Sequence, residues 1–164
     1  MRKIKIVKVV LSSAASGPDL DKSAKLLSII TGKKIQITKS GPKTRIPAFG
    51  VKPDMPLGAR VTLRGNEAIK ILKQMLGGVD NRVRKKQVAD NHFSFGIKEY
   101  IDVPGLVYDR NIGIRGFNTT IVFERAGMRI KKKKIKRGSV PKRQEIPKQE
   151  IINYMEESFG TKFI

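Results

Sequence analysis

The sequence predicts an α+β fold in which a mostly antiparallel sheet is covered by helices on one face. Several segments alternate apolar and polar residues with a period of two, as half-buried strands do. Segments with helical spacing interrupt this series of strands twice, and the last two strands then follow one another directly. With 164 residues, the chain can bury a core as one domain without covalent crosslinks.

The first strand is predicted over residues 2–11, from Arg2 to Leu11, but its alternation is imperfect. Ile4 and Ile6 would share one face, whereas Val7 and Val9 would share the other. A β-bulge and a strand buried on both sides are both compatible with this pattern. Residues 12–17 are small and are predicted to form a loop.

The first helix is predicted to begin at Pro18 and Asp19, where the Asp19 carboxylate can accept hydrogen bonds from first-turn amides. Apolar residues at near-helical spacing follow, and Gly32 is expected to end the helix.

Residues 32–64 combine two short alternating strands with a long loop. Ile35 and Ile37 mark the first strand, and Ala59, Val61 and Leu63 mark the second. The connecting loop, residues 39–57, is rich in proline, glycine and basic residues, and Phe49 is expected to anchor its returning limb. Loops of this length in a compact domain are usually functional or disordered.

The second half of the chain contains one more helix and two strands. A helix is predicted up to about residue 76, where Gly77 and Gly78 stop it. Residues 79–91 are predicted to be a polar connection, whose cluster of Arg82, Arg84, Lys85 and Lys86 fits a solvated loop as well as a contact with RNA. Residues 93–103 and 117–125 are predicted to be long partner strands.

The C-terminal segment differs from the rest in composition. Residues 127–143 contain no acid, and in the free protein they are expected to be disordered by charge repulsion. Their basic residues are Arg129, Lys131, Lys132, Lys133, Lys134, Lys136, Arg137, Lys142 and Arg143. A last helix is predicted between Pro147 and Gly160, with an apolar stripe that docks on the body or on a partner. We therefore expect residues 1–126 to form a single α+β RNA-binding domain and residues 127–164 to form a basic extension that ends in a short helix.

The charge of the chain indicates a polyanionic partner. The formal net charge is +21 and the sequence pI is about 10.5, which favours nucleic acid. A membrane surface is the competing polyanion, but the sequence has no transmembrane run, signal-peptide pattern or lipidation motif. Cysteine is absent and His92 is the single histidine, so we expect no enzyme, no metal site and no cofactor; a reducing cytoplasmic location fits.

The polar face of the predicted sheet favours donors and cations, with Asp102 and Glu124 as its acids and Tyr100 as its aromatic residue. Such a face suits recognition of the shape, phosphates and riboses of a structured RNA rather than base stacking. The residues predicted to bind RNA are Lys34, Gln36, Thr38, Arg60, Thr62, Arg64, Ser94, Lys98, Asn118 and Thr120.

Three short motifs have simpler interpretations. Gly113-Ile114-Arg115-Gly116 matches a loop that clamps RNA backbone, but that loop joins two helices and this one lies between two predicted strands. Asn118-Thr119-Thr120 matches a glycosylation acceptor and fits a strand equally well. His92 is predicted to be a turn residue.

Five groups of residues, in the same order, resemble the large-subunit ribosomal protein five family in its archaeal and eukaryotic form. They are residues 27–34 with 36–39, Phe49-Gly50-Val51, Val61-Thr62-Leu63-Arg64-Gly65, residues 93–99, and Tyr108-Asp109 with residues 112–116. The chain departs from the family pattern at residues 12–16, and at Gly41 and Pro42, which interrupt a basic run.

The resemblance implies a structural protein of the large ribosomal subunit, in the cytoplasm, that binds 5S rRNA and helps to form the central protuberance. It implies that the loop with Lys39, Lys43, Arg45 and Phe49 reaches the peptidyl-site (P-site) tRNA, and that Tyr108, Asp109, Arg110 and Arg115 face small-subunit ribosomal protein thirteen. Large-subunit rRNA is the expected partner of the basic extension, and large-subunit ribosomal protein eighteen is a candidate neighbour on the same 5S rRNA. A general RNA chaperone or assembly factor, and an RNA-modifying enzyme, are the alternatives.

Overall fold

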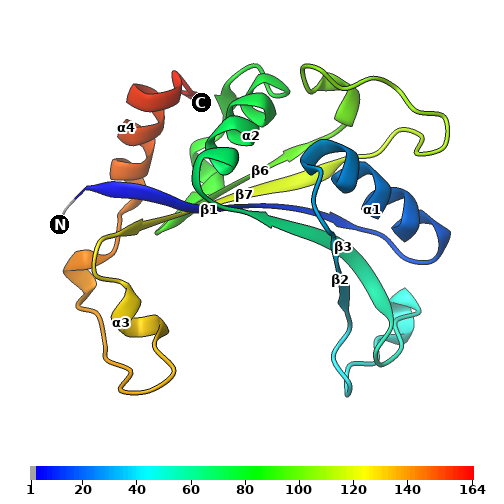
Figure 1. The fold of residues 1–164 in the computed structure, drawn as a ribbon, viewed down its shortest axis with the longest axis horizontal. Helices are drawn as coiled ribbons and strands as arrows, with labels where there is room; N and C mark the ends of the chain where they lie inside the picture. The colour runs from blue at the N-terminus through cyan, green and yellow to red at the C-terminus, as the bar shows by residue number, and fades with distance from the viewer. Residues whose placement is uncertain (1–2) are drawn as a thin grey trace.

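A six-stranded antiparallel sheet forms the centre of the protein in a computed structural model that describes residues 3–164 (Figure 1). The strand order is β2-β3-β1-β7-β6-β5. The strands are β1 (Ile4–Ala14), β2 (Gln36–Lys39), β3 (Pro56–Leu63), β5 (Val88–Ala89), β6 (His92–Ile97) and β7 (Phe117–Arg125). A small parallel pair joins β4 (Arg82–Val83) to β8 (Lys162–Phe163).

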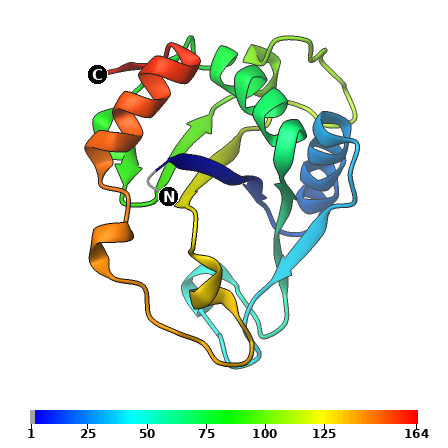
Figure 2. The same cartoon turned by 60° about the vertical axis from the view of Figure 1, so that its left-hand side comes forward.

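Three helices cover one face of the sheet. They are α1 (Pro18–Thr31), α2 (Gly65–Gly77) and α4 (Lys148–Phe159), and they lie side by side in both views (Figures 1 and 2). On the other side, the loop between β2 and β3 and the segment with the short helix α3 (Arg129–Lys132) extend from opposite ends of the sheet (Figure 1). The predicted α+β class with helices on one face is confirmed.

Strand β1 lies between β3 and β7 and is longer than predicted. Its register with β7 shifts between Ile6 and Lys8, so the predicted irregularity is a β-bulge. Residues 12–14 continue the strand instead of forming a loop, because Ser12 pairs with both Arg60 and Asn118. Arg2, predicted to begin this strand, lies outside the described residues.

The first two helices follow the sequence pattern closely. Helix α1 ends at Gly32, whose φ of 62° is the left-handed conformation that glycine adopts without strain. The residues of α2 that face the core include Ala68, Leu72 and Met75, as its stripe predicts. The predicted cap by Asp19 is wrong: no side chain caps α1, and the Asp19 carboxylate is directed to Arg115 and Lys22.

Two predictions in the second half are corrected. Residues 79–91 are not only a connection, since they contain β4, β5 and the 3₁₀ turn η2 (Lys85–Gln87). The strand predicted over residues 93–103 ends at Ile97, and the chain then forms the 3₁₀ turn η3 (Tyr100–Asp102). Tyr100 is therefore buried, and its hydroxyl accepts a hydrogen bond from the Asp109 N–H at 2.8 Å.

The C-terminal helix completes the hydrophobic core. Ile151 and Met155 of α4 are fully buried, and they join a cluster that contains Phe93, Ile121 and Phe123 of the sheet. The ring of Tyr154 packs edge-on against Phe123, with a centroid separation of 5.9 Å. The sequence left open whether this helix docks on the body of the protein or on a partner; in the structure it docks on the body.

Replacing Ile151 by alanine is expected to lower the free energy of unfolding by about 2–5 kcal/mol, because it leaves a cavity in the core. The matched control is Ile29→Ala, at a residue of α1 that is 56% exposed, where little change is expected. Urea denaturation measures both variants. Equal midpoints for Ile151→Ala and the unmutated protein would show that α4 is not part of the cooperative core.

Candidate nucleic-acid interface

The face of the sheet opposite the helices carries its side chains in rows that cross the strands. Residues directly opposite in an antiparallel pair point to the same side of a sheet. One row runs Gln36, Arg60, Ser12, Asn118 and Gly96, from β2 to β6. The next runs Thr62, Val10, Thr120 and Ser94, and a third runs Lys8, Val122 and His92. We call this surface the open face.

Hydrogen bonds link neighbours in these rows. The Arg60 Nε–H donates to Gln36 Oε1 at 3.0 Å, and the hydroxyl oxygens of Ser94 and Thr120 are 3.2 Å apart. The Thr38 hydroxyl donates to the Gly58 carbonyl at 2.9 Å. The centre of the open face thus holds ordered hydroxyl, amide and guanidinium groups.

Seven of the ten residues predicted to bind RNA lie on these strands, and three lie beside them: Lys34 precedes β2, Arg64 is the N-terminal flanking residue of α2, and Lys98 follows β6. All three are exposed. Tyr100 and Asp102, which were predicted to lie on this face, belong to η3 instead. The open face therefore has a mostly polar centre, in which Lys8 and Arg60 are the basic residues of the three rows, and a cationic rim.

Strand β1 also contributes residues to the open face, and none of them is among the ten predicted to bind RNA. Lys8, Val10 and Ser12 lie on the open face because they alternate with the buried residues Val9 and Leu11. This alternation is visible in the sequence from Lys8 onward, but the bulge reverses it before that point. Ser12 belongs to the run of small residues that predicts a loop, so its place in the strand is not apparent from the sequence.

A shallow hollow lies at one end of the open face. Its lining includes Ser12, Gly96, Lys98, Gly116 and Asn118. A Cβ built on Gly96 would be 3.0 Å from Asn118 Oδ1, and one built on Gly116 would be 2.5 Å from the Lys98 carbonyl oxygen. The two glycines therefore keep β6 and β7 close together here and leave the amide of Asn118 accessible.

The loop between β2 and β3, which we call the arm, is held together by hydrogen bonds between its two limbs. The Ser40 hydroxyl donates to the Lys52 carbonyl at 2.6 Å and accepts from the Met55 N–H at 2.9 Å. Ile46 and Val51 form an antiparallel bridge around the 3₁₀ turn η1 (Pro47–Phe49). The prediction that Phe49 anchors the returning limb of this loop is wrong, because the Phe49 side chain is 81% exposed.

The basic residues of the C-terminal segment are exposed from Arg129 to Arg137. Only Lys132 among them is paired with an acid within residues 3–164, and its partner is Glu124 of β7. Glu124 is the one acidic residue of the strands on the open face, and Lys132 offsets its charge. The predicted bias against acids is thus stronger in the structure than in the sequence.

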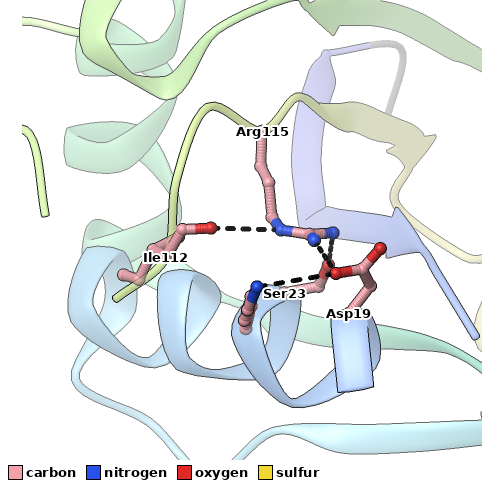
Figure 3. Close-up of polar contacts among 5 residues, drawn as sticks. Asp19, Ser23, Ile112 and Arg115 are labelled. Carbon is pink, nitrogen blue, oxygen red and sulfur yellow. Dashed lines mark hydrogen bonds and ion pairs between the residues drawn. The ribbon is translucent and has the colours of Figure 1, made fainter. Parts of the chain in front are cut away.

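A network of polar contacts holds the segment that precedes β7 against α1 (Figure 3). The Arg115 guanidinium pairs with Asp19, donates to the Ile112 carbonyl at 3.3 Å, and lies 3.4 Å from the Ser23 hydroxyl oxygen. Asp109 accepts from the Asn111 N–H at 2.9 Å. Of the four residues assigned to this surface from the resemblance, Tyr108 and Arg110 are exposed, whereas Asp109 and Arg115 are half-buried.

The remaining motifs have structural explanations. Gly116 is required by its closeness to the Lys98 backbone, so the Gly-x-x-Gly match needs no RNA clamp. His92 is not a turn residue but the first residue of β6, directly after the turn at Asp90 and Asn91; it is exposed, and its Nδ1 is 3.2 Å from the Asp90 carbonyl oxygen. No helix within residues 3–164 is long and apolar enough to cross a membrane.

A sheet that is covered on one side and presents a polar face with a cationic rim on the other defines the class of this protein: α+β proteins suited to bind a polyanion. Comparison with known proteins narrows the class. The family model that describes the C-terminus of the ribosomal protein L5 family matches residues 56–150.

Full-length relatives agree with this match. Large ribosomal subunit protein uL5 of Nanoarchaeum equitans is 41% identical over 167 residues, which cover 100% of this chain and 98% of that protein. The proteins of the same name from Sulfolobus acidocaldarius and Methanosphaera stadtmanae are 36% and 37% identical, over 100% and 88% of this chain and 93% and 85% of their own lengths. The chain belongs to the ribosomal protein L5 family, in its archaeal form, and this family consists of structural proteins rather than enzymes.

Replacing Gly116 by alanine is expected to lower the free energy of unfolding by about 1–3 kcal/mol, because the new Cβ would overlap backbone atoms that cannot move aside easily. The matched control is Gly41→Ala, where the nearest atom is the hydroxyl of Thr44 in an exposed loop. Thermal unfolding compares the two variants. If Gly116→Ala were as stable as Gly41→Ala while RNA binding disappeared, the motif would be an RNA clamp after all.

Proposed function

We propose that the protein is a structural constituent of the large ribosomal subunit that binds 5S rRNA through its open face and helps to form the central protuberance. The observation that carries this proposal is the arrangement of the open face, where rows rich in hydroxyl and amide groups, with Arg60 and Lys8 among them, cross the strands inside a rim of lysine and arginine. The names of the relatives support the ribosomal assignment.

The division between centre and rim suits a folded RNA. Phosphate contacts by lysine and arginine give affinity and position, whereas contacts to riboses and base edges give selectivity. Gln36, Thr62 and Asn118 offer hydrogen-bonding groups for the second task, and Lys34, Arg64 and Lys98 offer charges for the first. Among the exposed side chains on the strands of the open face, His92 at the start of β6 is the one aromatic ring, and none is Phe, Tyr or Trp, which argues against splayed single-stranded bases as the ligand.

The arm between β2 and β3 is proposed to contact the P-site tRNA. Its hydrogen bonds at Ser40 and its Ile46–Val51 bridge make it stiff, so it can hold Lys43, Arg45 and Phe49 away from the sheet. The arm and the sheet are thereby able to bind different RNA molecules.

The segment around Tyr108 is proposed to face small-subunit ribosomal protein thirteen. Val107, Tyr108 and Ile114 are exposed apolar residues in the segment between η3 and β7, and exposed apolar side chains fit a protein neighbour better than an RNA. The basic segment after β7 is proposed to contact large-subunit rRNA. Large-subunit ribosomal protein eighteen is a candidate neighbour on the 5S rRNA.

Substituting Asn118 by alanine is expected to reduce the preference for folded 5S rRNA over an unrelated duplex RNA more than it reduces total affinity, because a group that reads the RNA is removed while phosphate contacts remain. Gln36→Ala is expected to behave alike. The control is Gln149→Ala on α4, away from the open face, which is expected to change neither value. Filter binding with both RNAs measures the ratio, and equal reductions on both RNAs would contradict a reading role for the open face.

Substituting Lys39, Lys43 and Arg45 together by alanine is expected to leave 5S rRNA affinity within about 1 kcal/mol, as for groups outside that interface. Retention of P-site tRNA by reconstituted ribosomes is expected to fall. A control with the same loss of charge replaces Lys22, Lys25 and Lys73 on the helices. A loss of most 5S rRNA affinity with normal tRNA retention would assign the arm to 5S rRNA.

A further inference from the structure

The basic segment after β7 returns to the sheet instead of ending free. We call residues 127–145 the basic loop. The residue that follows this loop, Ile146, is fully buried. Its backbone forms two hydrogen bonds with Asn91, which lies in the turn between β5 and β6. The Ile146 N–H donates to Asn91 Oδ1 at 2.9 Å, and the Asn91 N–H donates to the Ile146 carbonyl at 3.1 Å.

Arg125, the last residue of β7, forms a second tie between the two ends of the basic loop. Its Nη1–H donates to the Arg143 carbonyl at 3.1 Å, and its Nη2 pairs with Glu150 in the first turn of α4. The Arg125 side chain is 11% exposed, so this contact is more shielded from solvent than an ordinary surface pair. The residue before the loop is thus bonded to the end of the loop and to the helix after it.

Asn91 is itself fixed to the sheet. The Phe123 N–H of β7 donates to the Asn91 carbonyl at 2.9 Å, and Asn91 has a φ of 64°, a left-handed conformation that asparagine tolerates. Asn91 therefore connects the sheet, through short and rigid links, to the point where the basic loop closes.

Apart from the pair between Lys132 and Glu124, the contacts of the basic loop are local and leave most of its charges without an acidic partner among residues 3–164. The Arg137 Nε–H donates to the Lys131 carbonyl at 2.6 Å, and the Gly138 N–H donates to the Ile130 carbonyl at 3.4 Å. These bonds use few charged groups, and the lysines from Lys131 to Lys136 are exposed. A loop that is closed at both ends has fewer conformations to lose when it binds than a free tail of equal charge.

We propose that Asn91 and Arg125 are positioning residues that hold the basic loop closed, so that its lysines are already in place beside the open face when RNA binds. The proposal rests on the proposed function in one respect, that the basic loop contacts ribosomal RNA. Neither residue needs to touch the RNA, since both act through the backbone of residues 143–146.

The test replaces Asn91 by glycine, which removes the Oδ1 acceptor, permits the same φ and leaves the charge unchanged. The matched control is Asn81→Gly, at an asparagine with a φ of 54° that stands in a turn between α2 and β4. Two measurements are made on each full-length variant: the rate at which a lysine-specific protease cuts residues 131–136 in the free protein, and the affinity for purified large-subunit rRNA over a range of potassium concentrations.

For Asn91→Gly we expect faster cutting and an affinity about three- to tenfold lower, with an unchanged dependence of affinity on salt, because the same lysines still meet the same phosphates. Lys133→Ala with Lys134→Ala is expected to do the reverse: cutting at the remaining lysines stays slow, and the salt slope falls by about 0.7–0.9 for each phosphate that the variant no longer neutralises. Asn81→Gly should match the unmutated protein in both measurements.

The possible outcomes distinguish the positioning role of Asn91 and Arg125 from the proposed function in RNA binding. Unchanged cutting and affinity in Asn91→Gly, together with a lower slope in the double lysine variant, would overturn the positioning role alone. A lower slope in Asn91→Gly would also overturn it, since the lysines would then neutralise fewer phosphates in the complex, whereas a purely positioning role leaves the final contacts unchanged. An unmutated protein that binds ribosomal RNA no better than an unrelated RNA would overturn the proposed function. If Asn91→Gly unfolds at a much lower temperature than Asn81→Gly, the charge-matched Arg125→Lys is used with the same expectations, and its failure to alter cutting or affinity would overturn the proposal.

Discussion

The whole structure depends on the position of β1 between β3 and β7. Both backbone edges of β1 are bonded, so its register decides which side chains of its neighbours face the helices. A shift by one residue would move Val9 and Leu11 to the open face and Ser12 into the core. The bulge between Ile6 and Lys8 restores this parity partway along the strand, where the first residues alternate in the opposite sense.

One-sided burial also explains why the chain uses two kinds of surface chemistry. The core is shared by the sheet, α1, α2 and α4, and it includes residues as distant in sequence as Val9 and Met155. With most apolar side chains directed inward, the open face carries mainly short polar side chains together with Arg60 and Lys8, and further cationic side chains gather around it on loops and strand ends. Helix α4 connects the core to the open face. It packs in the core, and its residue Glu150 pairs with Arg125 just before the basic loop that borders the open face.

Local pattern was sufficient for most elements and failed where a distant contact decides the structure. Helices α1, α2 and α4 and strand β7 could be predicted because periodicity, Gly32 and Gly160 define them locally, whereas the short helix α3 lies in a segment predicted to be disordered. The end of β6 could not, since the alternation continues past Ile97 and only the burial of Tyr100 against the Asp109 backbone stops the strand. The same holds for Asn91 and Arg125, whose partners lie 55 and 18 residues away in the chain.

Strand β2 has one backbone edge without a strand beside it, and Ile37 on it is 48% exposed. Such an edge can pair with the same edge of another molecule and start aggregation. Lys34 and Lys39 flank it, and the net charge of +21 makes approaching molecules repel one another. Salt screens this repulsion but leaves the backbone edge unchanged, so the colloidal stability of the RNA-free protein depends on low ionic strength.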